Sequence, residues 1–191
     1  MQESKGKEVL IFLDLETTGL DLEDKVCSIG LITLEDGEVN FLYELVNEGK
    51  KIPSKASSIH HITNEMIRDK PSLVDTQIYK LLCENNFEET TIVGHNVNFD
   101  IQKLKAVGFE FKGSLIDTLR VSRHLISECE SYALQFLRYE LKLYKNELTP
   151  LSSHHALDDA YVIKSLFEYL LDLTTQEKMC ELSFKNVLIE K

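Results

Sequence analysis

The chain has 191 residues, of which 43% are hydrophobic and 28% charged, and its formal net charge is −11. The length predicts one domain with a sizeable core. The acidic balance excludes a protein that coats nucleic acid through a broad basic surface, but not an enzyme that meets a phosphodiester locally. No apolar run approaches the roughly 20 residues of a membrane helix and no secretory signal is visible, so we expect a cytoplasmic protein without membrane contact. Because the four cysteines form no CxxC pair, we expect free thiols at Cys27, Cys83, Cys129 and Cys180.

The first predicted element is a buried strand, residues 9–13, that continues into Asp14 and Glu16 and ends at the turn Thr17-Thr18-Gly19. Side chains two positions apart on a strand share a face, so the two acids would lie side by side. Adjacent carboxylates repel each other unless a cation neutralises them, and Mg²⁺ prefers oxygen ligands. Alternatively, one acid lies in water and the other caps the next turn.

Two further strands, residues 26–34 and 39–46, flank a tight turn at Asp36-Gly37 and complete an antiparallel meander. Residues 47–58 are predicted to form a loop, and residues 59–67 a short helical or turn segment. A helix that opens at Pro71-Ser72 would have one apolar face, made of Val74, Ile78, Leu81 and Leu82.

Strands and helices then alternate. We predict strands at 91–93 and 114–116 and helices at 99–107, 118–126, 132–141 and 156–171, with Asn98 and Asp117 as N-caps and Gly108 as a helix end. This order predicts an α/β fold with a mixed sheet, antiparallel on one side, parallel on the other and flanked by helices. In such sheets, sites form at the carboxyl ends of central strands, which is where Asp14 and Glu16 lie.

The predicted domain spans residues 1–172, and residues 173–191 form a C-terminal tail. Residues 186–189 have the composition of a strand. They either add an edge strand to the sheet or begin a structure beyond this chain.

Two later motifs supply further acids. Asp100 lies in the first turn of a helix after the elbow HNVNFD, where it suits either a metal or the helix N-terminus. In SHHALDDA, Asp159 is favoured over Asp158 as a buried ligand because it shares a face with the apolar Ile163, Leu166 and Leu170. Helical spacing alone would pair Asp159 with His155, whereas His154 would lie in the preceding loop and turn toward the site. The alternative for His154 is a capping or surface histidine.

Together these segments resemble the DEDDh branch of the DnaQ-like 3′–5′ exonucleases, which have a ribonuclease H-like fold. The matching segments, in order, are FLDLETTGL, GHNVNFD and HHALDDA, and the family spacing runs from His154 to Asp159. IHHITNEMIRDKPS and IDTLRVSR match further family segments, although His61 stands where glycine is most frequent. Within the family, the residues of these segments most resemble exodeoxyribonuclease X. The proofreading subunit of DNA polymerase III is the next most similar member.

The resemblance implies a metal-dependent 3′–5′ exonuclease that acts on DNA and releases nucleoside 5′-monophosphates. Asp14, Glu16, Asp100 and Asp159 would hold two Mg²⁺ or Mn²⁺ ions, with Asp14 bridging both. His154 would take the proton from the attacking water, and Glu16 would join it in the catalytic set.

The expected substrate contacts come from the turn after the first strand and from two neighbouring segments. Backbone N–H groups of the turn would meet the terminal nucleotide, and Leu20 and Phe99 would wedge or stack against the last bases. Phe99 fits core packing at the helix start equally well, and His95 is expected to be structural. The predicted contacts are Thr17, Thr18, Gly19, Leu20, His60, Asn96 and Phe99.

Two other functions stay open at this point. One is an RNA-trimming exonuclease of the same branch, since the catalytic motifs are shared. The other is a non-catalytic nucleic-acid-binding or scaffold subunit, which the presence of all five catalytic-type residues argues against. The expected partners are nucleic acid 3′ ends, above all single-stranded DNA, together with DNA replication or repair proteins.

Overall fold

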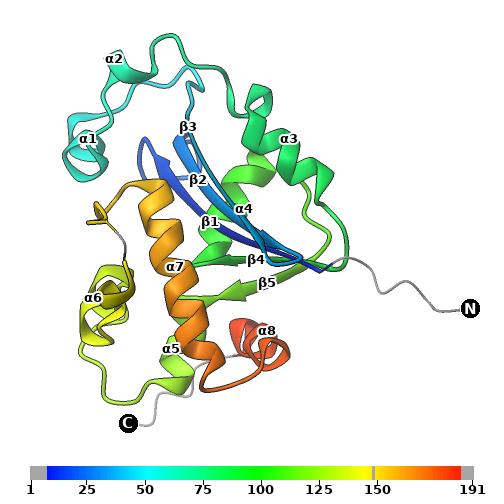
Figure 1. Ribbon diagram of the computed structural model, residues 1–191. Coiled ribbons are helices and arrows are strands. Elements are labelled where there is room, and N and C mark those ends of the chain that lie inside the picture. The colour runs from blue at the N-terminus through cyan, green and yellow to red at the C-terminus, as the bar shows by residue number, and fades with distance from the viewer. Residues whose placement is uncertain (1–7, 148, 186–191) are drawn as a thin grey trace, which may run out of the picture.

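The computed structural model describes residues 8–147 and 149–185, and its centre is a mixed sheet with helices on both faces (Figure 1). The strand order is β3-β2-β1-β4-β5. Strands β1 to β3 are antiparallel, whereas β4 runs parallel to both β1 and β5. The predicted mixed sheet is therefore confirmed. The strands are β1 (Val9–Thr17), β2 (Val26–Glu35), β3 (Glu38–Leu45), β4 (Thr90–Gly94) and β5 (Ser114–Asp117).

The helices cover both faces of this sheet. Helices α3 and α4 lie on one face, and α5 to α8 lie on the other. None of the helices in the described part of the chain has the length and hydrophobicity that a membrane crossing requires. The helices are α1 (Ser54–His60), α2 (Asn64–Ile67), α3 (Gln77–Glu84), α4 (Val97–Ala106), α5 (Thr118–Leu125), α6 (Leu134–Glu140), α7 (Ala156–Leu171) and α8 (Gln176–Phe184), with 3-10 turns η1 (Leu73–Asp75) and η2 (Leu143–Asn146).

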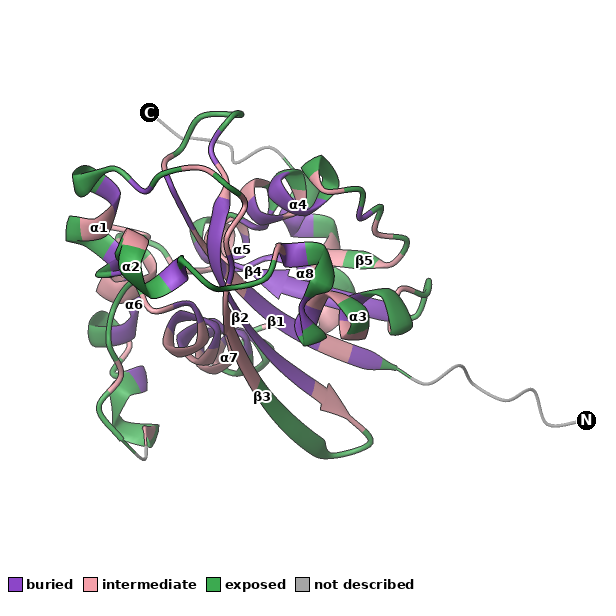
Figure 2. Cartoon of the chain, turned by 90° about the horizontal axis from the view of Figure 1, so that it is seen from above, coloured by how far each residue is buried: buried purple, intermediate pink, exposed green. Residues whose placement is uncertain are grey.

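Strand β1 is apolar on both faces because helices cover both. Ile11 and Leu13 pack with α3 and α4, whereas Phe12 meets Phe167 of α7 edge to face at 5.4 Å between ring centroids. A strand buried on both faces requires a nearly continuous apolar run, as residues 9–13 have. Figure 2 shows β1 and β2 buried and the outer part of β3 exposed.

The end of β1 is positioned by two features of the sheet. The parallel pairing with β4 stops at Phe12 and Val93, so the rest of β1 runs on beyond β4. Asp14 and Glu16 share the face of Phe12, which α7 covers. On β2, the partner of Asp14 is Gly30, where an added Cβ would lie 2.2 Å from the backbone of Ala156 and Leu157. The start of α7 therefore lies directly on the sheet beside the two acids.

Three local predictions are wrong. Residues 54–58 begin helix α1 and are not loop, although the segment is rich in polar serines. Asn96, not Asn98, is the N-cap of α4. Val74 is 42% exposed and Leu73 is buried in its place, because η1 shifts the phase of the helix that begins at Gln77.

The other helix ends agree with the sequence. Asp117 accepts hydrogen bonds from the backbone of Leu119 and Arg120 at the start of α5, and Gly108 follows α4 with a φ of 92°. All four cysteines are free. In the tail, α8 buries Met179 and Leu182 in the same cluster as α5 and α7. The strand predicted at 186–189 lies outside the described residues.

Candidate active site

The side chains of Asp14 and Glu16 project from β1 toward the start of α7, and the pKa of both carboxyl groups is raised. Burial raises the pKa of Asp14 well above its usual value, and the charges of Asp100, Asp159 and Glu16 raise it further. Burial, followed by the charge of Asp159, raises the pKa of Glu16 to about 8. The chain therefore holds four acids close enough to disfavour one another's ionisation.

Asp100 reaches this group from the first turn of α4. It is only 4% exposed, and burial raises its pKa well above the usual value, although a hydrogen bond from the Leu15 backbone favours the charged form. The elbow before α4 is fixed by Asp117, whose Oδ1 accepts from the Asn96 N–H at 3.0 Å. One buried acid thus caps α5 and also holds the elbow that aims Asp100 at β1.

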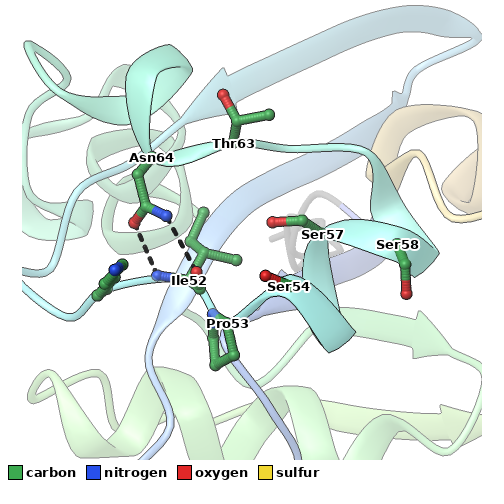
Figure 3. A pocket seen from close by; sticks show the side chains of 8 residues that line it. Ile52, Pro53, Ser54, Ser57, Ser58, Thr63 and Asn64 are labelled. Carbon is green, nitrogen blue, oxygen red and sulfur yellow. Dashed lines mark hydrogen bonds between the residues drawn. The ribbon is translucent and has the colours of Figure 1, made fainter.

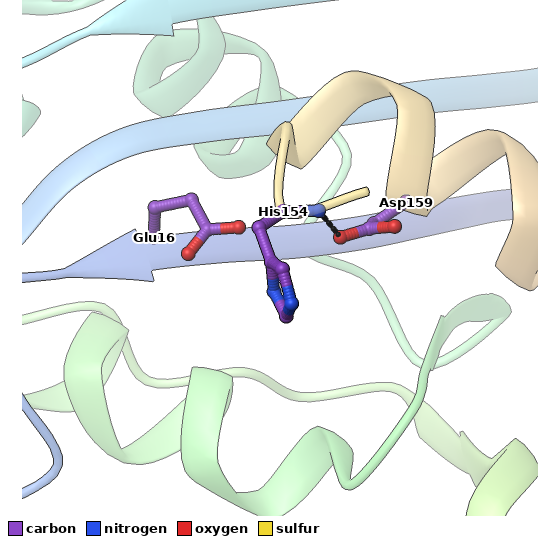
Figure 4. Close-up of side chains that lie close together, drawn as sticks. All are labelled: Glu16, His154 and Asp159. Carbon is purple, nitrogen blue, oxygen red and sulfur yellow. Dashed lines mark hydrogen bonds between the residues drawn. The ribbon is translucent and has the colours of Figure 1, made fainter. Parts of the chain in front are cut away.

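Asp159 and His154 flank the start of α7, opposite Glu16 (Figure 4). Asp159 is 6% exposed, and burial raises its pKa. The backbone N–H of His154 donates to Asp159 Oδ2 at 2.9 Å, and His154 has a left-handed φ of 59°. One ligand atom of each of Glu16, His154 and Asp159 lies within 4.8 Å of the others. The His154 ring itself is exposed, and Asp158 is less buried than Asp159.

These donors fit a divalent metal ion. Asp100 and Asp159 are buried, Asp14 and Glu16 are half-buried, and the pKa of each carboxyl group is raised, so ionising all four together requires positive charge nearby. Carboxylate oxygens suit hard cations such as Mg²⁺ and Mn²⁺. The site thus has the acidic and histidine donors of a divalent-metal centre.

The turn after β1 is a loop, residues 18–25, that internal hydrogen bonds hold together. Thr18 donates its N–H to Lys25 O at 2.8 Å and its hydroxyl to Asp24 Oδ1 at 2.9 Å, so its backbone is not available to a nucleotide in this conformation. Lys103 of α4 is buried, and its Nζ donates to the carbonyl oxygens of Asp21 and Asp24 at 2.5 and 2.9 Å. At the tip of this loop, Leu20 is 86% exposed.

His60 lies against the site from the end of α1. It is buried, its Nδ1 accepts from the Ile62 N–H at 3.1 Å, and its Nε2 lies 3.7 Å from Cys27 Sγ. Burial lowers its pKa, and the neighbouring charge of His154 lowers it further. The next residue, His61, has a left-handed φ of 60°, which explains why glycine suits this position.

The remaining predicted contacts lie around the start of α4. Phe99 is half-buried with Lys103 Nζ 5.2 Å from its ring centroid, so it is not part of the core clusters. Asn96 is exposed. The ring of His95 contacts Thr118 Oγ1 at 3.0 Å and Tyr132 O at 2.8 Å, which is a structural arrangement.

A separate open pocket lies beside α1 and α2 (Figure 3). None of the four acids lines it. Asn64 forms one side by exchanging two hydrogen bonds with the Ile52 backbone, at 2.8 and 3.0 Å. This pair ties α2 to the segment before α1 and thereby holds the helix that carries His60.

Sequence reasoning did not find the residues that support Asp159 and the loop after β1. Gln135 donates to Asp159 Oδ1 at 2.5 Å, and Arg138 donates to Gln135. Lys103 holds the loop after β1 from a distance of about 80 positions along the chain. The sequence does place Gln135 and Arg138 three residues apart on one predicted helix, so that they can contact each other. This spacing does not show that Asp159 and Glu147 are their partners.

Comparisons with known proteins agree with this geometry. A family model described as an exonuclease matches residues 11–167. The DNA polymerase III PolC-type protein of Thermotoga maritima is 31% identical over 93% of this chain, but the chain spans only 13% of that protein's length. The DNA polymerase III subunit epsilon of Treponema pallidum is 30% identical over 83% of this chain and 74% of its own. A solved structure of exonuclease X with 5′ overhanging duplex DNA has a TM-score of 0.72 and 29% identity, and the match covers 91% of this chain and 99% of that one.

Proposed function

Because the chain belongs to the exonuclease family whose model matches residues 11–167, we propose that it hydrolyses DNA from the 3′ end and releases nucleoside 5′-monophosphates. Its mixed sheet and flanking helices have the ribonuclease H-like fold of the DnaQ-like exonucleases, as the sequence predicted. The observation that carries the proposal is the convergence of four acids and His154 at the end of β1.

The proposed metal ligands are Asp14, Glu16, Asp100 and Asp159, and the proposed cofactor is a pair of Mg²⁺ or Mn²⁺ ions. Asp14 is the central ligand, since the charges of all three other acids raise its pKa. When bound, the ions would supply the positive charge that activates a water molecule and stabilises the leaving 3′ oxygen.

The side chains around the acids have roles in proton transfer and substrate binding. The exposed imidazole of His154 accepts the proton of the attacking water, because it lies beside Glu16 and Asp159 and is open to solvent. Leu20 at the loop tip and Phe99 contact the terminal bases, and His60 borders the nucleotide. The local backbone of Thr17 and Gly19 shapes the turn, since Thr17 Oγ1 donates to Gly19 O at 2.6 Å.

The choice of DNA follows from the relatives. Exonuclease X is named with duplex DNA, and the two sequence relatives are named as DNA polymerase III chains. These names support DNA as the substrate and DNA replication proteins as partners. Attack at the 3′ end and partners in DNA repair are further parts of the proposal. A role in replication predicts faster removal of a mispaired 3′ nucleotide than of a paired one.

A panel of substrates tests the proposal. Single-stranded DNA, duplex DNA with a 5′ overhang and RNA, each labelled at its 5′ end, are incubated with Mg²⁺, Mn²⁺ or EDTA. We expect a descending ladder from DNA with either metal, release of 5′-monophosphates and no cleavage in EDTA or by Asp14→Asn. Faster cleavage of RNA would assign the chain to the RNA-trimming alternative, and no cleavage of any substrate would support a non-catalytic binding subunit.

A further inference from the structure

A series of hydrogen bonds leads from a buried ion pair to one of the four acids. Arg138 on α6 is 4% exposed and donates two hydrogen bonds to Glu147, from Nε to Oε1 at 2.7 Å and from Nη2 to Oε2 at 2.5 Å. Its Nη1 donates to Gln135 Oε1 at 3.1 Å, and Gln135 Nε2 donates to Asp159 Oδ1. We propose that Arg138 and Gln135 are positioning residues that orient the Asp159 carboxylate for a metal ion. This role rests on the function proposed above.

The orientation of the Gln135 amide follows from the chemistry of its neighbour. A guanidinium group only donates hydrogen bonds, so Gln135 must turn its carbonyl oxygen toward Arg138. The amide NH₂ group then faces Asp159 and donates to it. A flipped amide would place an oxygen against the carboxylate. Arg138 therefore decides which end of the Gln135 side chain Asp159 meets.

The two oxygens of Asp159 have different fixed donors. Oδ1 accepts from Gln135, and Oδ2 accepts from the backbone N–H of His154 at 2.9 Å. Two donors from different segments fix the plane of the carboxylate. A carboxylate has about four lone-pair positions, so each oxygen keeps acceptor capacity for a cation.

The same guanidinium also holds the segment that leads to His154. Glu147 and Leu151 both lie in this segment, and Nη1 and Nη2 of Arg138 donate to Leu151 O at 3.4 and 3.5 Å. Because His154 follows three residues after Leu151, one side chain restrains the approach to the proposed base. Through its hydrogen bond to Gln135, Arg138 also orients Asp159.

The buried ion pair between Arg138 and Glu147 is not expected to add much to the free energy of unfolding. Removing two charges from water is costly, and apolar residues of similar volume are often equally stabilising in such places. A pair with both charges buried beside an active site is better explained by what it orients. The same reasoning supplies a test variant in which both charges are removed together and no unpaired charge remains.

The test compares Gln135→Leu and the double variant Arg138→Met/Glu147→Leu with the unmodified chain. We expect kcat on single-stranded DNA to fall about tenfold in both, with little change in KM, because the substrate contacts are untouched. Affinity of the metal-free protein for Mn²⁺, titrated by electron paramagnetic resonance, should fall by a similar factor. Lys178→Met, which removes an exposed ion pair with Glu181 on α8, is the matched control and should change neither quantity.

Combining all three substitutions separates positioning from general damage. Since the effect of Arg138 on Asp159 passes through Gln135, the triple variant should lose less than the product of the two separate losses, and any loss beyond that of Gln135→Leu comes from the contacts of Arg138 with Glu147 and Leu151. Gln135→Leu keeps the ion pair, so the test stands even if the double variant fails to fold. Unchanged kcat and Mn²⁺ affinity in Gln135→Leu would overturn the inference. If the unmodified chain binds Mn²⁺ but cuts no nucleic acid, the proposed function fails, and the Mn²⁺ titration still decides the role of Gln135.

Discussion

Gly30 of β2 and Ala156 at the start of α7 are in backbone contact. A Cβ on Gly30 would lie 2.2 Å from the carbonyl carbon of Ala156, closer than any side chain can approach. In the sheet register Gly30 is the partner of Asp14, and Asp159 follows Ala156 within one helical turn. The missing side chain thus sets how closely two of the four acids approach each other.

Gly30→Ala should therefore displace α7 and misplace Asp159. We expect a loss of about 1–3 kcal/mol in the free energy of unfolding, since the neighbour is backbone and cannot rotate away. A displacement of about 1 Å should lower kcat on the order of 100-fold. Urea unfolding and DNA hydrolysis measure the two effects. Ile32→Val, on the same face of β2, should cost about 1 kcal/mol and leave kcat unchanged. Wild-type kcat in Gly30→Ala would refute this account.

Asp14→Asn should abolish hydrolysis and stabilise the metal-free protein. Burial and three neighbouring acids raise the pKa of Asp14, so its charge is unfavourable when no cation is bound. The neutral amide removes that repulsion, and we expect a higher melting temperature at pH 8. Thermal unfolding in EDTA measures it. Asp172→Asn, at the exposed end of α7, should give no such gain. A lower melting temperature for Asp14→Asn would contradict the prediction.

The protein should lose stability in mild acid through His95. Burial lowers the pKa of His95 to about 4, against about 6.5 in an unfolded chain. Between these values the unfolded chain binds more protons, so this contribution is complete above pH 6.5 and is lost as the pH falls toward 4. We expect the loss to be about 2 kcal/mol between pH 7 and 4.5. Urea unfolding at several pH values should show a shallower slope for His95→Gln, and equal slopes would contradict the assignment.

Lys103→Met should weaken DNA binding more than catalysis. The Lys103 ammonium group bonds the carbonyl oxygens of Asp21 and Asp24, and without it the loop that carries Leu20 loses its anchor to α4. The acids on β1 do not depend on these bonds. We expect KM for DNA to rise about tenfold, the equivalent of about 1.4 kcal/mol, with kcat nearly unchanged. Lys105→Met on the same helix is exposed and serves as the control. A fall in kcat without a change in KM would mean that Lys103 acts on the acids themselves.

His61→Gly should stabilise the chain. A left-handed backbone costs a side-chain-bearing residue about 1–2 kcal/mol, whereas glycine adopts it freely and gives back roughly 0.5–1 kcal/mol through its unfolded-state entropy. The net gain should be about 0.5–1 kcal/mol in urea unfolding. Arg123→Gly, inside the helical backbone of α5, should instead cost about 1 kcal/mol. Destabilisation by both variants would exclude strain at His61.

The sequence predicted the sheet because its signals are local. Residues 9–13 and 26–34 are apolar runs long enough for buried strands, and Asp36-Gly37 marks the hairpin between β2 and β3. Asp117 and Gly108 were placed at helix ends by rules that involve only neighbouring residues. The candidate acids were found in the same way, from their positions after a strand or within a helical period.

The features that were missed depend on contacts distant in sequence. Asn96 begins α4 without a side-chain cap, and its own N–H donates to Asp117, 21 positions later. Gln135 meets Asp159 across 24 positions. Lys103 looks like a surface lysine on a helix, and only the fold shows that its ammonium group lies under the loop after β1. No local pattern contains these partners, so sequence reasoning could identify the candidate acids but not the residues that hold them.

The four acids occupy positions 14, 16, 100 and 159, on β1, α4 and α7. During synthesis, Glu16 leaves the ribosome 143 residues before Asp159. Until α7 packs against Gly30, the candidate acids are not brought together. A nascent or partly unfolded molecule should thus be unable to cut the nucleic acid around it, because hydrolysis requires α7 to be in place.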